Sequence, residues 1–246
     1  MKKRNFFRDL AVYIITSTRL LLLKGRWREY FTDLAYFFQW RMYRTSSKGT
    51  LDYRVPWLVF GSIGFLDRWL SMSMKVYEYG SGGSTLYFAD HTGFVVSVEH
   101  DKEWYQAAAA VINKEALAHV TYRLIEPVSY EGLQLDFLQP QNYTSSFQKY
   151  NGYEFSTYAR SIDAYADDTF DLVVVDGRVR ASCILHALPK IKKGGALLLD
   201  NADRFFYLTP FPELMNKSKW KQLVFEGHFP YGPASILNTT MVFIRQ

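Results

Sequence analysis

Cysteine is almost absent from this sequence, and its few histidines are scattered. The single cysteine, Cys183, leaves no partner for a disulfide within the chain and fits a reducing compartment. None of the five histidines belongs to an H-x-x-x-H pattern, and no C-x-x-C pair is present. The sequence therefore predicts neither a disulfide framework nor a zinc site.

A long apolar run is missing as well. The most apolar stretch, residues 10–23, has 14 residues and is interrupted by Arg19. A membrane-spanning helix needs about 20 apolar residues, and a secretory signal needs a small-residue cleavage site that does not follow here. We therefore expect a cytoplasmic protein.

Positive charge is concentrated at the beginning of the chain. Residues 1–50 contain 11 Lys or Arg and 3 acidic residues, whereas the rest contains 18 basic and 21 acidic residues. A polar break, SSKGT, occupies residues 46–50. These features divide the chain into a basic amphipathic helical extension, residues 1–49, and a main domain, residues 50–246.

The extension is expected to form two amphipathic helices, residues 5–23 and 27–44, because apolar side chains recur at helical spacing in both. They could pack on the main domain or form a dimer surface. Alternatively, residues 1–48 bind a membrane surface, which would place the protein peripherally at the inner membrane face, because Lys and Arg flank an aromatic-rich face. No stacking motif is present, so no nucleic-acid partner is expected. The oligomeric state does not follow from the sequence.

The most informative stretch, residues 74–100, is predicted to form strand, glycine turn, helix and strand. Gly80, Gly82 and Gly83 follow an apolar run, and Glu99 ends the second one. Glycines let the turn approach a ligand closely, and the N-terminus of the following helix favours anionic groups. An acid at the end of the second strand of such a unit accepts hydrogen bonds from ribose hydroxyls.

A second region, residues 169–204, contains two further strands that end in acids. The first ends at Asp176 and the second at Asp200 and Asn201, with a helix predicted between them. Ligands in open α/β sheets bind beyond the carboxyl ends of the strands. We therefore expect four acids to converge on one crevice: Glu78, Glu99, Asp176 and Asp200.

These motifs resemble those of class I S-adenosylmethionine-dependent methyltransferases. The resemblance rests on YEYGSGGST, SVEHD, VVVDGRVR and LLLDNADR, in that order, and covers roughly residues 56–246. It implies an α/β, Rossmann-like fold with a mostly parallel seven-stranded sheet and an antiparallel C-terminal strand pair. The two strand-like runs at the end of the chain, residues 220–227 and 239–246, fit that pair.

The resemblance also implies S-adenosylmethionine as the cofactor and assigns roles to individual residues. The implied cofactor-binding residues are Glu78, Gly80, Ser81, Gly82, Gly83, Ser84, Glu99, His100 and Asp176. The implied catalytic residues are Asp176, Arg178, Asp200 and Asn201.

Asp176, Asp200 and Asn201 also resemble the magnesium ligands of cation-dependent O-methyltransferases. The glycine turn differs from the pattern of that subgroup, so we do not expect a metal site. Arg178 and Arg180 could bind an anionic group of the substrate. Alternatively, they are solvated charges at a helix start or pair with Asp203.

A long segment without clear periodicity, residues 128–157, contains Tyr143, Tyr150 and Tyr153. A loop of this length in a compact domain is often functional, so it is either a lid over the substrate or a plain surface insertion.

The function expected from the sequence is methyl transfer from S-adenosylmethionine to a small-molecule or saccharide/lipid acceptor, at oxygen. Two alternatives remain. A nucleotide-sugar transferase could use Asp200-x-x-Asp203 with a metal ion. A membrane-recruited, non-catalytic binding module could retain the same fold.

Overall fold

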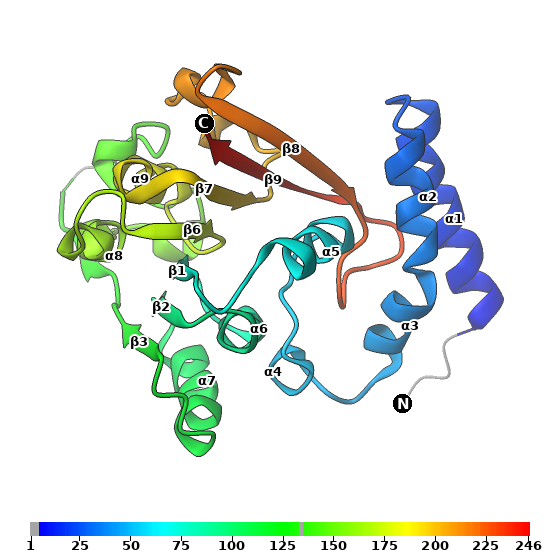
Figure 1. The fold of residues 1–246 in the computed structure, drawn as a ribbon, viewed down its shortest axis with the longest axis horizontal. Coiled ribbons are helices and arrows are strands. Elements are labelled where there is room, and N and C mark those ends of the chain that lie inside the picture. Colours follow the sequence, from blue (N-terminus) through cyan, green and yellow to red (C-terminus); the bar gives the residue numbers. More distant parts are fainter. Residues whose placement is uncertain (1–4, 133–134) are drawn as a thin grey trace.

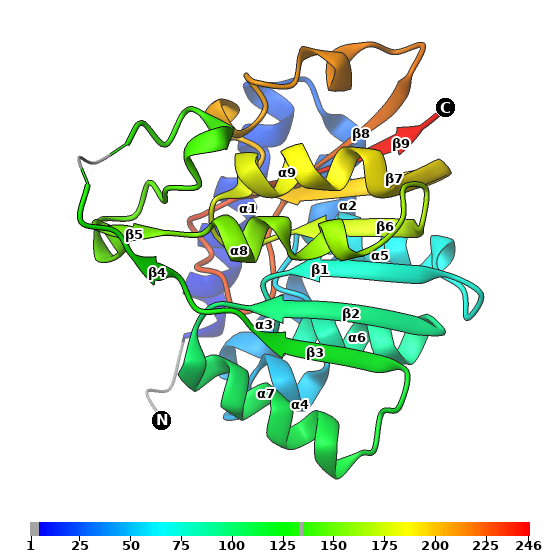
Figure 2. The same ribbon diagram turned by 90° about the vertical axis from the view of Figure 1, so that its left-hand side faces the viewer.

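The computed structural model describes residues 5–132 and 135–246. Its centre is a seven-stranded sheet in the order β3-β2-β1-β6-β7-β9-β8 (Figures 1 and 2). β9 runs antiparallel to both of its neighbours, β7 and β8, and the other neighbouring strands of this sheet are parallel. The strands are β1 (Lys75–Tyr79), β2 (Phe94–Glu99), β3 (Val120–Leu124), β6 (Phe170–Val175), β7 (Ile191–Asp200), β8 (Trp220–Gly227) and β9 (Asn238–Arg245). The predicted fold class, including its antiparallel C-terminal pair, is confirmed.

Helices cover both faces of the sheet. Figure 2 shows α8 and α9 on the near face, with α5 and α6 behind the sheet. The α-helices are α1 (Phe6–Leu22), α2 (Trp27–Ala35), α3 (Phe37–Thr45), α4 (Thr50–Tyr53), α5 (Phe60–Trp69), α6 (Gly83–His91), α7 (Lys102–Lys114), α8 (Ser156–Ala159) and α9 (Arg180–Ala187). The 3-10 helices are η1 (Pro140–Asn142), η2 (Gln148–Tyr150), η3 (Arg160–Ala164), η4 (Leu188–Lys190), η5 (Phe205–Tyr207) and η6 (Pro212–Met215). A separate antiparallel pair, β4 (Val128–Ser129) and β5 (Tyr153–Glu154), joins the two ends of the long segment.

Alternation along the strands builds two cores. On β1, Tyr77 and Tyr79 pack with α8 and α9, whereas Val76 packs with α5, α6 and the N-terminal helices. Successive strand side chains point to opposite faces, so a strand buried on both faces is apolar throughout. This explains why the runs at β1, β2 and β6 are nearly continuous in apolar residues.

The chain order creates a switch point between β1 and β6. From β1 the chain moves outward to β2 and β3, and then returns to place β6 on the other side of β1. Loops at the carboxyl ends of these two strands diverge there, which is the usual ligand position in such sheets.

A buried polar network fixes the N-terminal helices to the C-terminal strands. The Asp33 carboxylate accepts hydrogen bonds from Ser17 Oγ (2.6 Å), His228 Nδ1 (2.7 Å) and the His228 backbone N–H (2.7 Å). Tyr13 stacks on the His228 ring at 3.6 Å and donates its hydroxyl to the Asp33 carbonyl. These polar groups tolerate burial because each of them has a hydrogen-bond partner.

Several element boundaries differ from the prediction. The second helix of the extension breaks at Tyr36, whose backbone N–H bonds to Asp33. Helix α5 begins at Phe60, four residues after Pro56, and the Phe60 N–H donates to the carbonyl of His228. Residues 156–164 form one α-helical turn followed by a 3-10 helix. Among the described helices, none combines the length and apolarity required to traverse a bilayer.

Replacing Asp33 with Ala should lower the free energy of unfolding by about 3–5 kcal/mol, because it leaves the buried His228 ring without its acid. Urea unfolding followed by circular dichroism measures this. The matched control is Asp167→Ala, since Asp167 is exposed and its ion pair with Lys190 is worth about 0–1 kcal/mol. A loss for Asp33→Ala no larger than for the control would contradict the structural role of the network.

Candidate active site

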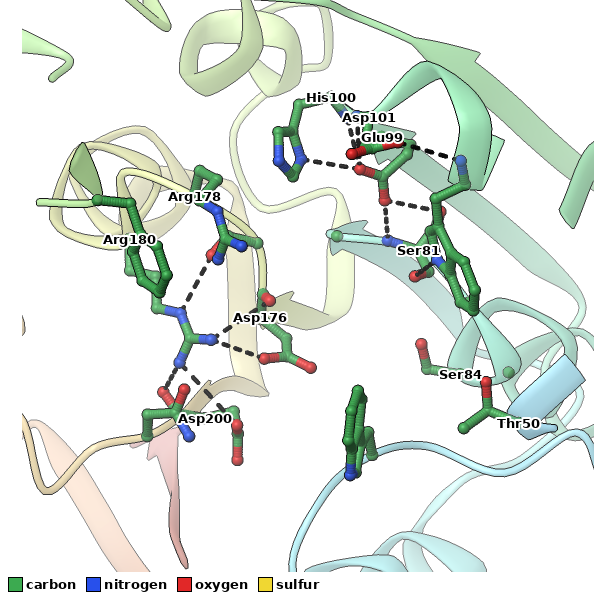
Figure 3. Close-up of a pocket in the computed structure, with 18 of the residues that line it drawn as sticks. Thr50, Ser81, Ser84, Glu99, His100, Asp101, Asp176, Arg178, Arg180 and Asp200 are labelled. Atoms are coloured by element: carbon green, nitrogen blue, oxygen red, sulfur yellow. Dashed lines mark hydrogen bonds and ion pairs between the residues drawn. The ribbon is translucent and has the colours of Figure 1, made fainter. Parts of the chain in front are cut away.

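A cavity of about 810 Å³ opens at the carboxyl ends of β1, β2, β6 and β7. Figure 3 shows Ser81, Glu99 and His100 on one side of it, facing Asp176, Arg180 and Asp200 on the other. All but one of the predicted site residues line it: Gly80, Ser81, Gly82, Gly83, Ser84, Glu99, His100, Asp176, Arg178, Asp200 and Asn201.

Gly80 allows the turn after β1 to lie close to the turn after β6 at the switch point. Its backbone has a φ of +90°, and a Cβ built there would lie 2.7 Å from the backbone of Gly177. Any side chain at residue 80 would therefore force the turn after β1 away from the turn after β6.

Glu99 is buried at the rim of the cavity and fully engaged by its surroundings. Its carboxylate accepts hydrogen bonds from Ser81 N and Oγ (both 2.9 Å) and from the N–H groups of His100 and Asp101 (both 2.8 Å). Burial opposes ionisation of Glu99. The side chain of His100, whose Nδ1 lies 2.8 Å from Glu99 Oε1, and the backbone N–H groups of Asp101 and Ser81 outweigh this effect and hold the pKa of Glu99 below the usual range. Glu99 is thus a fixed negative charge beside the glycine turn.

The turn itself is held by two aromatic residues. Trp104 Nε1 donates to the carbonyl of Ser81 at 2.6 Å, and the Ser81 hydroxyl lies 2.6 Å from Tyr122 OH. If the Ser81 hydroxyl gives up its hydrogen bond to Glu99, it therefore still has Tyr122 as a partner.

On the other side, the buried guanidinium of Arg180 lies between two acids. Its Nη2 is 2.8 Å from Asp176 Oδ1, its Nη1 donates to the carbonyl of Asp200, and Nη1 lies 4.0 Å from Asp200 Oδ2. Burial and the charge of Asp200 raise the pKa of Asp176, although Arg180 opposes the shift. Burial also raises the pKa of Asp200, against the opposing effect of Arg180. The alternatives of a solvated Arg180 or a pair with Asp203 are both wrong.

The residues do not fit a magnesium site. Arg180 already supplies the positive charge between Asp176 and Asp200. The Asp200 carboxylate also accepts hydrogen bonds from β9. Within residues 5–132 and 135–246, no cluster of three His, Cys, Asp or Glu side chains could hold a metal ion. Asp203 does not line the cavity, so a metal held by Asp200-x-x-Asp203 is not supported there either.

Arg178 differs from Arg180 in having no acidic partner in the described part of the chain. Its guanidinium carbon lies 4.4 Å from the ring centroid of Phe147 and 5.8 Å from that of Tyr150. Its Nε is buried and has no hydrogen-bond partner among the described residues. Val179, in the left-handed region at a φ of 44°, separates the two arginines. A β-branched residue is rare in that conformation, and the turn sends the two side chains to different parts of the site.

The long segment contributes to the cavity through fewer tyrosines than predicted. Tyr150, Phe147 and Lys149 line it. The hydroxyl oxygen of Tyr150 lies 2.9 Å from His100 Nε2. Tyr143 and Tyr153 do not line it. Residues 133–134 of this segment lie outside the described residues, and its action as a lid stays a prediction.

The sequence did not indicate several of the lining residues. Trp104 lies on α7, Phe147 lies in the long segment, and Phe229 and Asn238 come from the end of the chain. No local motif marks them, because each reaches the cavity through strand order and not through a fixed spacing.

Glu78 is the exception among the predicted acids. It is fully buried and does not line the cavity; its carboxylate accepts hydrogen bonds from Thr85 Oγ1 and Ser97 Oγ, both at 2.6 Å. The expectation that four acids share the crevice is therefore wrong for Glu78, whose hydroxyl partners lie on the neighbouring α6 and β2. Burial raises the pKa of Glu78 to about 7.

This shift predicts how stability depends on pH. Because the folded-state pKa of Glu78 is raised from 4.5 to about 7, its contribution to stability is present below the unfolded value and is lost as pH rises through about 7. Glu78→Gln removes this ionisation. The variant should gain stability over the natural protein as pH rises from 5 to 8, by up to about 3 kcal/mol.

Thermal and urea unfolding of both proteins across this pH range provide the measurement. The control, Glu131→Gln, changes an exposed glutamate and should show a constant difference from the natural protein. A pH-independent difference for Glu78→Gln as well would show that Glu78 does not titrate in the folded protein as described.

Comparisons with known proteins agree on the fold. No model of a protein family matches the sequence, and a search of curated proteins finds no match. Among solved structures, a putative O-methyltransferase from Klebsiella pneumoniae superimposes with a TM-score of 0.54 at 14% identity, over 82% of this chain and 92% of that one.

Two further solved structures superimpose on this chain. An O-methyltransferase from Bacillus cereus in complex with SAH has a TM-score of 0.53 at 12% identity, over 96% of this chain and 100% of that one. An rRNA methylase from Streptococcus thermophilus has a TM-score of 0.50 at 10% identity, over 76% of this chain and 95% of that one. Together with the strand order, these similarities show that the chain has the Rossmann-like fold of class I S-adenosylmethionine-dependent methyltransferases.

Proposed function

We propose that this protein transfers the methyl group of S-adenosylmethionine to a hydroxyl oxygen of a small-molecule acceptor, a class that includes saccharides and lipid headgroups. The observation that carries the proposal is the meeting of the glycine turn, Glu99 and Asp176 around one cavity at the switch point of the sheet. The structural neighbours support it, since one of them is an O-methyltransferase bound to SAH.

The residues on the Glu99 side suit the nucleoside part of the donor. An ionised carboxylate can accept the two hydroxyls of a ribose, and these would replace the hydrogen bond from Ser81, whose hydroxyl keeps Tyr122 as a partner. Trp104 and Tyr150 offer aromatic surfaces for an adenine ring nearby. The volume of about 810 Å³ lies within the range of about 300–1,000 Å³ that is typical of small-molecule sites.

The residues on the Asp176 side suit the methyl-transfer step. S-adenosylmethionine supplies a methyl group on a positively charged sulfur, which an acceptor oxygen can displace. Asp176 retains 26% of its side-chain exposure, lines the cavity, and has a raised pKa, so its carboxylate can take the proton that the acceptor hydroxyl loses. Arg180 holds that carboxylate in place and opposes the rise in its pKa that burial causes.

The rest of the cavity offers positions for the acceptor. Trp57 and Phe229 form an aromatic wall, with ring centroids 6.4 Å apart. Arg178 supplies a positive charge without an acidic partner among the described residues, which suits an anionic group of the acceptor.

The experiment that tests this function is transfer of a labelled methyl group from S-adenosylmethionine into fractions of a cell extract. On the acceptor so found, activity of the natural protein should rise with pH through the raised pKa of Asp176, because only the ionised carboxylate takes the proton. Asp176→Asn should lower kcat by roughly 10²–10⁴-fold and abolish that pH dependence, while donor affinity stays within a few-fold.

The matched control is Asp203→Asn, an exposed acid outside the cavity, which should retain the pH profile. Activity of Asp176→Asn equal to that of the control would exclude Asp176 as the base. Absence of labelled product from every fraction would count against methyl transfer itself.

A further inference from the structure

Helix α1 exposes large apolar side chains although another of its faces already packs on the protein. The side that faces the rest of the protein buries Tyr13, Thr16, Ser17 and Leu20, with Ser17 bonded to Asp33. The outer side exposes Phe7 (77%), Ile15 (64%) and Leu22 (77%), which a soluble surface helix would normally bury. Packing within the protein therefore does not account for the exposed apolar residues of α1.

Helices α2 and α3 also expose large apolar side chains. They bury Asp33 and the rings of Phe37, Trp40 and Tyr43, and they expose Trp27 (56%), Phe31 (62%) and Phe38 (73%). The two sets meet at Phe6, whose ring lies 5.7 Å from that of Phe37 and 6.5 Å from that of Phe38. We call the exposed set the outer aromatic face: Phe7, Ile14, Ile15, Leu22, Trp27, Phe31, Phe38 and Met42.

Basic side chains without acidic partners accompany this face. Arg8, Arg19 and Arg28 are exposed and form no ion pair within residues 5–132 and 135–246; Arg28 lies over the ring of Trp27 at 5.1 Å. Of the three acids of the extension, Asp33 is buried and Asp9 pairs with Arg41, so only Glu29 remains to offset these arginines. Figure 1 shows the three helices in blue along one side of the molecule, with α1 outermost.

From this combination we infer that the outer aromatic face docks onto the surface of a bilayer that contains anionic phospholipid. Aromatic and aliphatic side chains enter the headgroup region, while arginines beside them contact phosphates. The charge decides between occupants: a second copy of the chain would bring the same unpaired arginines against one another, whereas an anionic lipid surface complements them. The inference is independent of the proposed function, because it needs neither donor nor acceptor.

Co-sedimentation of the full chain with vesicles tests this surface. The natural protein should pellet with phosphatidylcholine vesicles that contain phosphatidylglycerol, and pellet less with phosphatidylcholine alone or at high salt. The double variant Phe31→Ser/Phe38→Ser should bind at least tenfold more weakly, as should Arg19→Glu/Arg28→Glu. The control is Phe205→Ser, an equally exposed phenylalanine outside the extension (78%), and should bind like the natural protein.

Two results would overturn the inference. One is equal pelleting of the natural protein and Phe31→Ser/Phe38→Ser, or no pelleting of either. The other is a dimer in light scattering that this double variant dissociates, which would assign the face to a second copy. Circular dichroism of each variant verifies that it is folded, so weaker binding cannot be attributed to unfolding.

Discussion

The guanidinium of Arg180 holds together the carboxyl ends of β6 and β7, and the chemistry of the cavity depends on that contact. Asp200 is buried there and Asp176 is partly buried. Burial raises the pKa of both, and the charge of Asp200 raises that of Asp176 further. A single buried cation that bonds to Asp176 and to the backbone of Asp200 lets both strand ends remain side by side. The same cation occupies the position that a metal ion would need.

The two sides of the cavity consequently differ in character. Glu99 is held ionised by donors from three neighbouring residues, so it is a fixed anion suited to binding. Asp176 has a raised pKa and remains partly exposed to the cavity, so it is suited to taking a proton. Groups whose environments push their pKa values in opposite directions can take different roles in one reaction.

Local patterns predicted the sheet well and long-range pairings poorly. The order of strand, glycine turn, helix and strand predicted for residues 74–100 is found in β1, α6 and β2, because strands buried on both faces have a distinctive composition. The two strands predicted at the end of the chain match β8 and β9 to within a residue. The burial of Glu78 by Thr85 and Ser97 depends on which hydroxyls fold against it. No local spacing encodes the insertion of Arg180 between two acids.

The N-terminal helices also depend on a long-range contact that local sequence patterns do not encode. Their amphipathic pattern predicted the helices but left open which side faces the protein. The answer depends on Asp33 and His228, which are 195 residues apart in the chain and meet only in the folded protein. That buried contact turns Tyr13 and Ser17 of α1 inward and leaves Phe7, Ile15 and Leu22 outside. Two residues shortly after α3, Thr50 and Trp57, line the cavity. The extension is thus continuous with the rim of the site.

The most direct test of the central claim is isothermal titration calorimetry of the natural protein with S-adenosylmethionine and, separately, with NAD and a UDP-sugar. The account predicts micromolar affinity for S-adenosylmethionine alone, a loss of at least tenfold in Glu99→Ala, and no loss in Glu126→Ala, which changes an exposed acid outside the cavity. Preferential binding of NAD or the UDP-sugar, or full affinity for S-adenosylmethionine in a folded Glu99→Ala variant, would contradict it.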